Sequence, residues 1–127
     1  MKGTAVAVAI ALLAVPTLAA APDPLAGRVA GAPAECIALD RVQGPDIRDD
    51  GTIIYRQNRS RLWLTRPVAP CLSLRPPATL IVAVYGSHLC RNDRFRVQRT
   101  GSGIPGPICR FGRFVPYDLP RPTARSG

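Results

Sequence analysis

Six arginines near the C-terminal end of the chain are the residues whose type and spacing most directly suggest a binding chemistry. Guanidinium groups bind phosphate and carboxylate through paired N–H donors, and aromatic rings between them can stack on the rings of a ligand. This segment would therefore form a polyanion-binding face for an envelope polymer, lipopolysaccharide or nucleic acid. The residues concerned are Arg91, Arg94, Arg96, Arg99, Arg110 and Arg113, interleaved with Phe95, Phe111 and Phe114.

A simpler interpretation explains the same arginines by coding bias alone. The chain is rich in alanine, proline and arginine, and Lys2 is its only lysine, which would follow from a GC-rich coding sequence. Without residues 1–19, sixteen arginines and eight acidic residues leave a formal charge of +8. Such a domain would be basic without a specific ligand, and its binding to anionic polymers would be lost at modest salt.

The sequence offers few of the side chains that enzymes use. His88 is the only histidine, which excludes histidine-cluster metal sites and H-E-x-x-H chemistry. Ser87 precedes it, but neighbours in an extended chain point to opposite faces, so we do not expect the two to act together. Asp46, Asp49 and Asp50 lie around one turn without the full pattern of a calcium loop. We therefore predict a non-enzymatic protein with no catalytic residue, metal or cofactor.

Residues 101–106 match the G-x-G-x-x-G pattern of dinucleotide-binding turns. That site requires a helix to begin at the turn, because the helix N-terminus holds the pyrophosphate. Pro105, Pro107 and the strand-like residues 108–111 oppose such a helix. We expect a hairpin loop here.

The four cysteines, at positions 36, 71, 90 and 109, predict two disulfide bonds. None of them forms a C-x-x-C motif, which disfavours a zinc ribbon or a thioredoxin-type redox pair. An even number of cysteines in a small exported chain is typical of disulfides, each worth about 2–4 kcal/mol. Three pairings are possible. We favour Cys71 with Cys90 and Cys36 with Cys109, a nested arrangement that closes one short loop and ties both ends of the domain together.

The N-terminus has the order of features found in a secretory signal peptide. Met1 and Lys2 precede an unbroken apolar run, Ala5–Val15, which is followed by small residues suited to cleavage. The run has eleven residues, whereas a membrane anchor needs about 20. We expect residues 1–19 to be removed and the mature protein to be periplasmic or secreted, with no transmembrane segment after processing.

The rest of the chain divides by composition. Residues 20–34 are mostly alanine, proline and glycine and predict a linker, residues 35–119 hold the apolar runs of one small β domain, and residues 120–127 predict a disordered tail. Proline and glycine together account for 25 of the 127 residues, which disfavours a helical bundle.

Short β-branched and aromatic runs separated by turn residues predict a mainly β fold. Residues 52–57 and 61–66 form a predicted hairpin after the turn at residues 49–51. A continuous apolar run over 80–85 indicates a buried strand, and the alternation over 94–99 a half-solvated antiparallel strand. With strands at 108–111 and 114–117, we expect a small antiparallel roll or barrel of five or six short strands, stapled by disulfides.

The order of landmarks between residues 35 and 117 resembles a domain-of-unknown-function family of small exported proteins from Gram-negative bacteria. The resemblance implies an exported, cross-linked domain and assigns no catalytic residue. Members typically have Cys-Pro after the hairpin, whereas Leu72 follows Cys71 here. The matching landmarks are Cys36-Ile37, Asp49-Asp50 with Thr52-Ile53, a second strand containing Trp63, Cys71, Leu89-Cys90 with Asp93, and Cys109 before Phe111-Gly112-Arg113-Phe114.

Two functions remain open from the sequence. The first is an exported, non-enzymatic structural or interaction domain, which the missing catalytic groups and the cysteine pattern favour. The alternative is a polyanion-binding module that uses the arginines. The partner is unknown, and an anionic envelope polymer is the candidate that the charge suggests.

Overall fold

The computed structural model describes residues 2–17 and 22–122 and contains ten short strands and one short 3-10 helix. Residues 2–17 contain no helix or strand. The elements in chain order are β1 (Val29–Ala30), β2 (Cys36–Ala38), η1 (Leu39–Arg41), β3 (Gln43–Ile47), β4 (Ile53–Arg56), β5 (Arg61–Thr65), β6 (Ala78–Val82), β7 (His88–Cys90), β8 (Arg94–Arg99), β9 (Ile108–Arg110) and β10 (Val115–Asp118).

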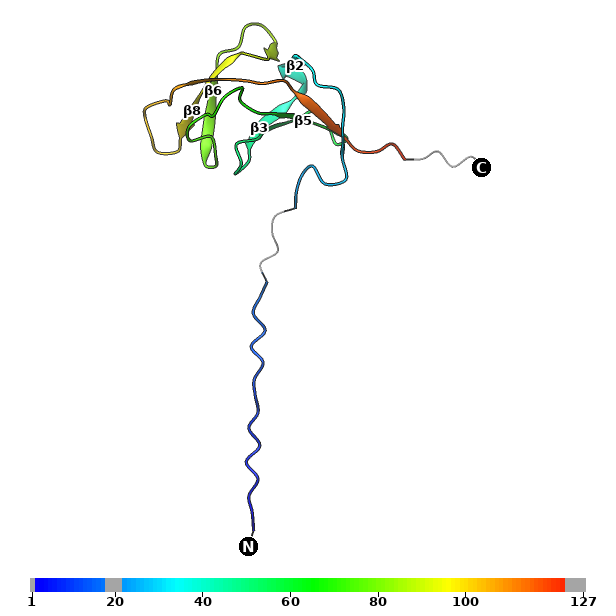
Figure 1. Ribbon diagram of the computed structural model, residues 1–127, viewed down its shortest axis with the longest axis vertical. Helices are drawn as coiled ribbons and strands as arrows, with labels where there is room; N and C mark the ends of the chain where they lie inside the picture. The colour runs from blue at the N-terminus through cyan, green and yellow to red at the C-terminus, as the bar shows by residue number, and fades with distance from the viewer. Residues whose placement is uncertain (1, 18–21, 123–127) are drawn as a thin grey trace, which may run out of the picture.

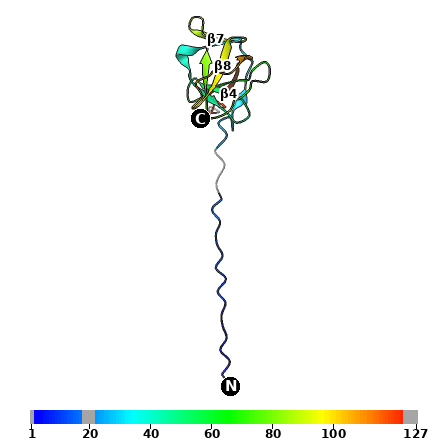
Figure 2. The same cartoon turned by 90° about the vertical axis from the view of Figure 1, so that its left-hand side faces the viewer.

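The strands form three antiparallel sheets that lie in one body, seen in two views at right angles (Figure 1 and Figure 2). The sheets have the orders β1-β10-β5-β4-β3, β2-β7 and β6-β8-β9. The predicted mainly β, antiparallel, disulfide-linked fold is confirmed. The strands are more numerous than the five or six expected, and over residues 22–122 the sheets do not close into a barrel.

The predicted hairpin is β4 and β5. At its turn the Asn58 side-chain oxygen accepts hydrogen bonds from the backbone N–H groups of Ser60 and Arg61, at 2.9 and 2.8 Å. The turn that precedes the hairpin is also as expected, because Asp50 Oδ1 accepts the Thr52 N–H at 3.0 Å. Both turns use Asx side chains to bond the backbone, which is why these residues favour turns.

The main core lies between the sheets and is centred on three phenylalanines. Phe95, Phe111 and Phe114 are at most 1% exposed, and their rings form a chain with centroid separations of 4.4 and 5.9 Å. Isoleucines and leucines from five other segments of the chain pack around it: Ile37, Ile47, Ile53, Leu74 and Leu89. Tilted ring pairs at these distances are favourable beyond the area they bury.

The apolar run over 80–85 is not a fully buried strand. Strand β6 pairs with β8 at a sheet edge, and its residues alternate between half-buried and exposed. Ile81 is 43% exposed and Tyr85, in the loop after the strand, is 86% exposed. The prediction was wrong because an unbroken apolar run does not reveal that only one face of the strand meets the core.

Residues 22–34, which we expected to be linker, contribute to the fold. Strand β1 pairs with β10, and Ala34 bridges to Phe114. The Arg28 guanidinium donates to the carbonyl oxygens of Pro24, Arg59, Ser60 and Tyr117, at 2.7–3.4 Å. Composition missed this attachment because one arginine and backbone hydrogen bonds provide it, without an apolar pattern. The predicted tail, 120–127, lies partly outside the described residues.

The disulfides join Cys36 to Cys90 and Cys71 to Cys109, so the nested pairing that we favoured is wrong. Strands β2 and β7 pair with Cys36 directly opposite Cys90, with their Cα atoms 4.0 Å apart. The second bond ties the loop after β5 to β9, across 5.9 Å between Cα atoms. Strand pairing decides the connectivity, and the two bonds interlace along the chain.

The two disulfides indicate an oxidising, extracytoplasmic environment. Among the residues described, no helix is both long and apolar enough to cross a membrane. The signal peptide over residues 1–19 and the periplasmic or secreted location stay predictions.

Peptide mapping without reduction tests the connectivity. We expect one linked fragment pair containing Cys36 and Cys90 and another containing Cys71 and Cys109, with no titratable thiol in the folded protein. Fragments joining Cys71 to Cys90 would contradict the observed strand pairing.

A glycine beside the aromatic core gives a second test. A Cβ on Gly112 would lie 2.5 Å from the Arg66 carbonyl oxygen, which already accepts the Gly112 N–H at 2.8 Å. Gly112→Ala should therefore lower the free energy of unfolding by about 1–3 kcal/mol, because backbone must move. Gly103→Ala is the matched control, since its Cβ meets nothing within 4 Å, and should change stability by less than about 0.5 kcal/mol. Equal urea midpoints for both variants would contradict the close contact.

Candidate functional site

The three-stranded sheet presents arginines on its outer face because β8 alternates strictly. Arg94 and Arg96 are exposed, while Phe95 and Val97 between and beyond them are 1% and 3% exposed. This is the half-solvated strand that the sequence predicts. Period-two alternation sends successive side chains to opposite faces, so burying the two apolar residues requires both arginines to face solvent.

Neighbouring strands extend this surface in register. Arg110 of β9 lies directly opposite Arg94. In the next cross-strand row Arg96 lies between Ile81 of β6 and Ile108 of β9. We call this surface the arginine face, and define it as Arg94, Arg96, Arg110, Ile81 and Ile108.

Within the described part of the chain, the three arginines of this face form no ion pair. Arg96 Nη1 donates one hydrogen bond to the Gly106 carbonyl oxygen at 3.1 Å. Arg94 and Arg110 are directly opposite each other, and like charges in that position are destabilising. Three neighbouring guanidinium groups without a carboxylate are thus free to bind an anion.

The other three predicted arginines are not part of this face. Arg91 and Arg113 both reach Glu35, at 3.8 and 3.0 Å from its Oε1. Arg99 is the last residue of β8 and pairs with Ala78. The alternation of side chains along the strand places it on the opposite side of the sheet from Arg94 and Arg96. Of the six arginines predicted to cluster, three therefore share the arginine face and the other three lie elsewhere.

The phenylalanines cannot serve as stacking platforms, contrary to the sequence-based expectation. All three form the core and are at most 1% exposed. Phe95 lies in the inward row of β8. Phe111 and Phe114 form isolated β-bridges, with Pro67 and Ala34 respectively. A ligand of the arginine face therefore meets guanidinium and aliphatic groups.

An apolar hollow of about 220 Å³ lies at this face. Sequence reasoning missed it, although the apolar run of β6 contained the signal. Its lining consists of Ile81, Val82, Ala83, Arg94, Phe95, Arg96 and Ile108.

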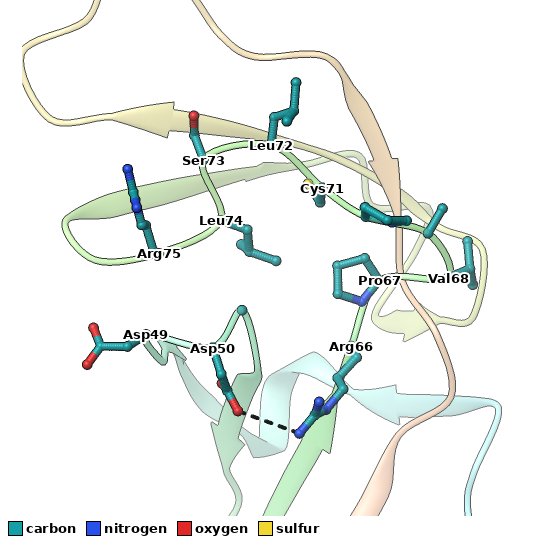
Figure 3. A pocket seen from close by; sticks show the side chains of 13 residues that line it. Asp49, Asp50, Arg66, Pro67, Val68, Cys71, Leu72, Ser73, Leu74 and Arg75 are labelled. Atoms are coloured by element: carbon teal, nitrogen blue, oxygen red, sulfur yellow. Dashed lines mark ion pairs between the residues drawn. The ribbon is translucent and has the colours of Figure 1, made fainter.

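A larger, open pocket of about 840 Å³ lies between the β3–β4 turn and the loop after β5 (Figure 3). Leu74 and Pro67 point into it, whereas Asp49 points away. Arg66 reaches Asp50 across the lower side, at 3.6 Å between Nη2 and Oδ2. The centre of this pocket is therefore apolar, and its two carboxylates do not face each other across a substrate space.

The Asp50 carboxylate is held ionised by its surroundings. The Thr52 N–H donates to it and, with a smaller contribution from the Arg66 charge, lowers the pKa of Asp50 below its usual range. A carboxyl group with a lowered pKa is a poor general acid at neutral pH. This residue therefore closes a turn rather than supplying a proton.

The single histidine does contact the serine beside it. Ser87 Oγ lies 3.2 Å from His88 Nδ1, so the expectation that the two side chains diverge is wrong at this entrance to β7. Both residues are exposed. Over residues 22–122 no carboxylate bonds to the imidazole, and no three histidine, cysteine or acidic side chains group as metal ligands. The pair lacks the orienting group of a nucleophile–base arrangement.

No known protein family, curated protein or solved structure matches this chain significantly. The resemblance to a family of small exported proteins stays a prediction.

The pH dependence of stability tests the role of Asp50. Because its folded-state pKa is lowered, its contribution is present above the unfolded-state pKa and is lost as the pH falls through the folded-state value. Asp50→Asn should therefore lower the free energy of unfolding at neutral pH, by no more than about 1 kcal/mol for so exposed a group. This difference from wild type should vanish in acid. Asp49→Asn, which removes the neighbouring exposed carboxylate and leaves the bonds of Asp50 to Thr52 and Arg66 in place, is the matched control.

Proposed function

We propose that this protein is an exported, non-enzymatic interaction domain that binds polyanions through the arginine face. The observation that carries the proposal is the placement of Arg94, Arg96 and Arg110 side by side on one solvent face without an ion pair among the described residues. A surface that keeps like charges adjacent costs stability, and an anionic ligand would offset that cost.

The rest of the molecule supports an extracytoplasmic binding role. Two disulfides stabilise a small domain outside the cytoplasm, and periplasm or external medium would expose it to anionic polymers. The formal charge of +9 for the whole chain attracts such polymers at long range. The coding-bias interpretation accounts for the abundance of arginine, but it makes no prediction of where unpaired arginines gather.

A non-enzymatic role rests on the chemistry of the candidate groups. The His88 side chain is exposed, and within the described structure its one hydrogen bond is the local contact with Ser87. Asp50 is engaged with Thr52 and Arg66. None of these groups combines a nucleophile, a base and an orienting partner in one cavity.

Heparin affinity as a function of salt tests the proposal. The variant Arg94→Ser/Arg96→Ser/Arg110→Ser removes the three charges of the face. If each arginine contacts an anionic group, the slope of log affinity against log salt should become shallower by about 2–3.

The matched control is Arg41→Ser/Arg56→Ser/Arg59→Ser, which removes the same charge from exposed arginines outside the face. We expect the wild type and this control to be retained at about 0.3 M salt and the face variant to elute earlier. Equal losses in the two triple variants would mean that only net charge matters, and the arginine face would then have no special role.

A further inference from the structure

The arginine face carries exposed aliphatic side chains at its centre, not only charge. Ile81 is 43% exposed and Ile108 is 49% exposed, and they flank Arg96 in one cross-strand row. Single exposed apolar residues are common on protein surfaces. Here the two border the same hollow on either side of Arg96, so apolar side chains lie directly beside the guanidinium groups of the face.

The hollow selects for a particular kind of ligand. Its lining includes both isoleucines, together with residues of β6 and β8. Among the described residues, the charged groups that line it are Arg94 and Arg96. A molecule that fills it needs an apolar portion with an anionic group directly beside it.

Nucleic acids match this surface poorly. Single-stranded nucleic acids are held by aromatic side chains on which bases stack, but Phe95, the aromatic residue of β8, is 1% exposed. A bilayer surface instead presents phosphates above acyl chains. Arginines at such a surface place their charge at the phosphates and their stems among apolar groups, and aliphatic side chains enter the boundary below.

We propose that the arginine face docks on the surface of an anionic lipid bilayer. Arg94, Arg96 and Arg110 contact lipid phosphates, and Ile81 and Ile108 enter the boundary between headgroups and acyl chains. The inference rests on the proposed function, because the same guanidinium groups provide the anion contacts. It adds an apolar contact that a soluble polyanion cannot make.

Vesicle binding of the exported protein, which we expect to lack residues 1–19, tests this inference by flotation. The probes are vesicles of equimolar phosphatidylglycerol and phosphatidylcholine, with pure phosphatidylcholine for comparison. Ile81→Thr/Ile108→Thr keeps β-branched residues in the strands and should weaken binding to the anionic vesicles about tenfold, since buried methylene groups are lost. The triple arginine variant should weaken it about 100-fold. Wild type should bind pure phosphatidylcholine vesicles far more weakly.

The matched control is Val29→Thr/Leu119→Thr, which alters two aliphatic residues that are 62% and 40% exposed on the β1–β10 side of the five-stranded sheet, away from the face. We expect this control to bind vesicles within about twofold of wild type. Heparin retention separates the two proposals. If Ile81→Thr/Ile108→Thr weakens vesicle binding and leaves heparin retention unchanged, the bilayer inference is supported.

Unchanged vesicle binding by the isoleucine variant would overturn the bilayer inference and leave the polyanion face intact. Failure of the wild type to bind either heparin or vesicles would overturn both proposals. Tighter binding to a single-stranded oligonucleotide than to anionic vesicles would overturn the bilayer inference alone.

A salt titration of the wild type gives a second test that needs no variant. Vesicle binding should fall less steeply with salt than heparin retention, because apolar contacts are not screened. Equal steepness would contradict insertion of the isoleucines.

Discussion

The alternation along β8 is the constraint on which the arginine face depends. This strand pairs with β6 on one side and β9 on the other, so its register is set twice. Phe95 and Val97 belong to the core, and a slip of one residue would bury guanidinium groups in their place. Burying an unpaired charge is very unfavourable. The register that places the apolar residues of β8 in the core is therefore also the register that keeps its arginines in solvent.

The domain is small, and it supplements its core with contacts of other kinds. The three phenylalanine rings connect the sheets, and the disulfides attach β2 to β7 and the loop after β5 to β9. Arg28 fastens the N-terminal segment through four carbonyl oxygens. Domains of about this size commonly need such additions, because a modest core contributes only a few kcal/mol of net stability.

Arginine has two different environments in this protein. Arg61 makes two hydrogen bonds of 2.7 Å to Asp118 across the β5–β10 pair and lies over the Trp63 ring, with its Cζ 5.3 Å from the ring centroid. Arg28 is likewise structural. The arginines of the outer face, by contrast, have no carboxylate partner in the described structure. A coding bias explains why arginine is frequent, whereas this division follows from which side chains the sheets bring near an acid.

The local features are already predictable from the amino-acid order: the turns at Asp50 and Asn58, the β4–β5 hairpin, the alternation of β8 and the presence of two disulfides. These follow from backbone preferences and periodicities that span a few residues. Tertiary structure alone decided which cysteines meet, that β6 is an edge strand with one exposed face, that β1 joins a sheet, and that three of six arginines share a surface. Each of these depends on which distant strands pair, and many strand pairings satisfy the same local patterns equally well.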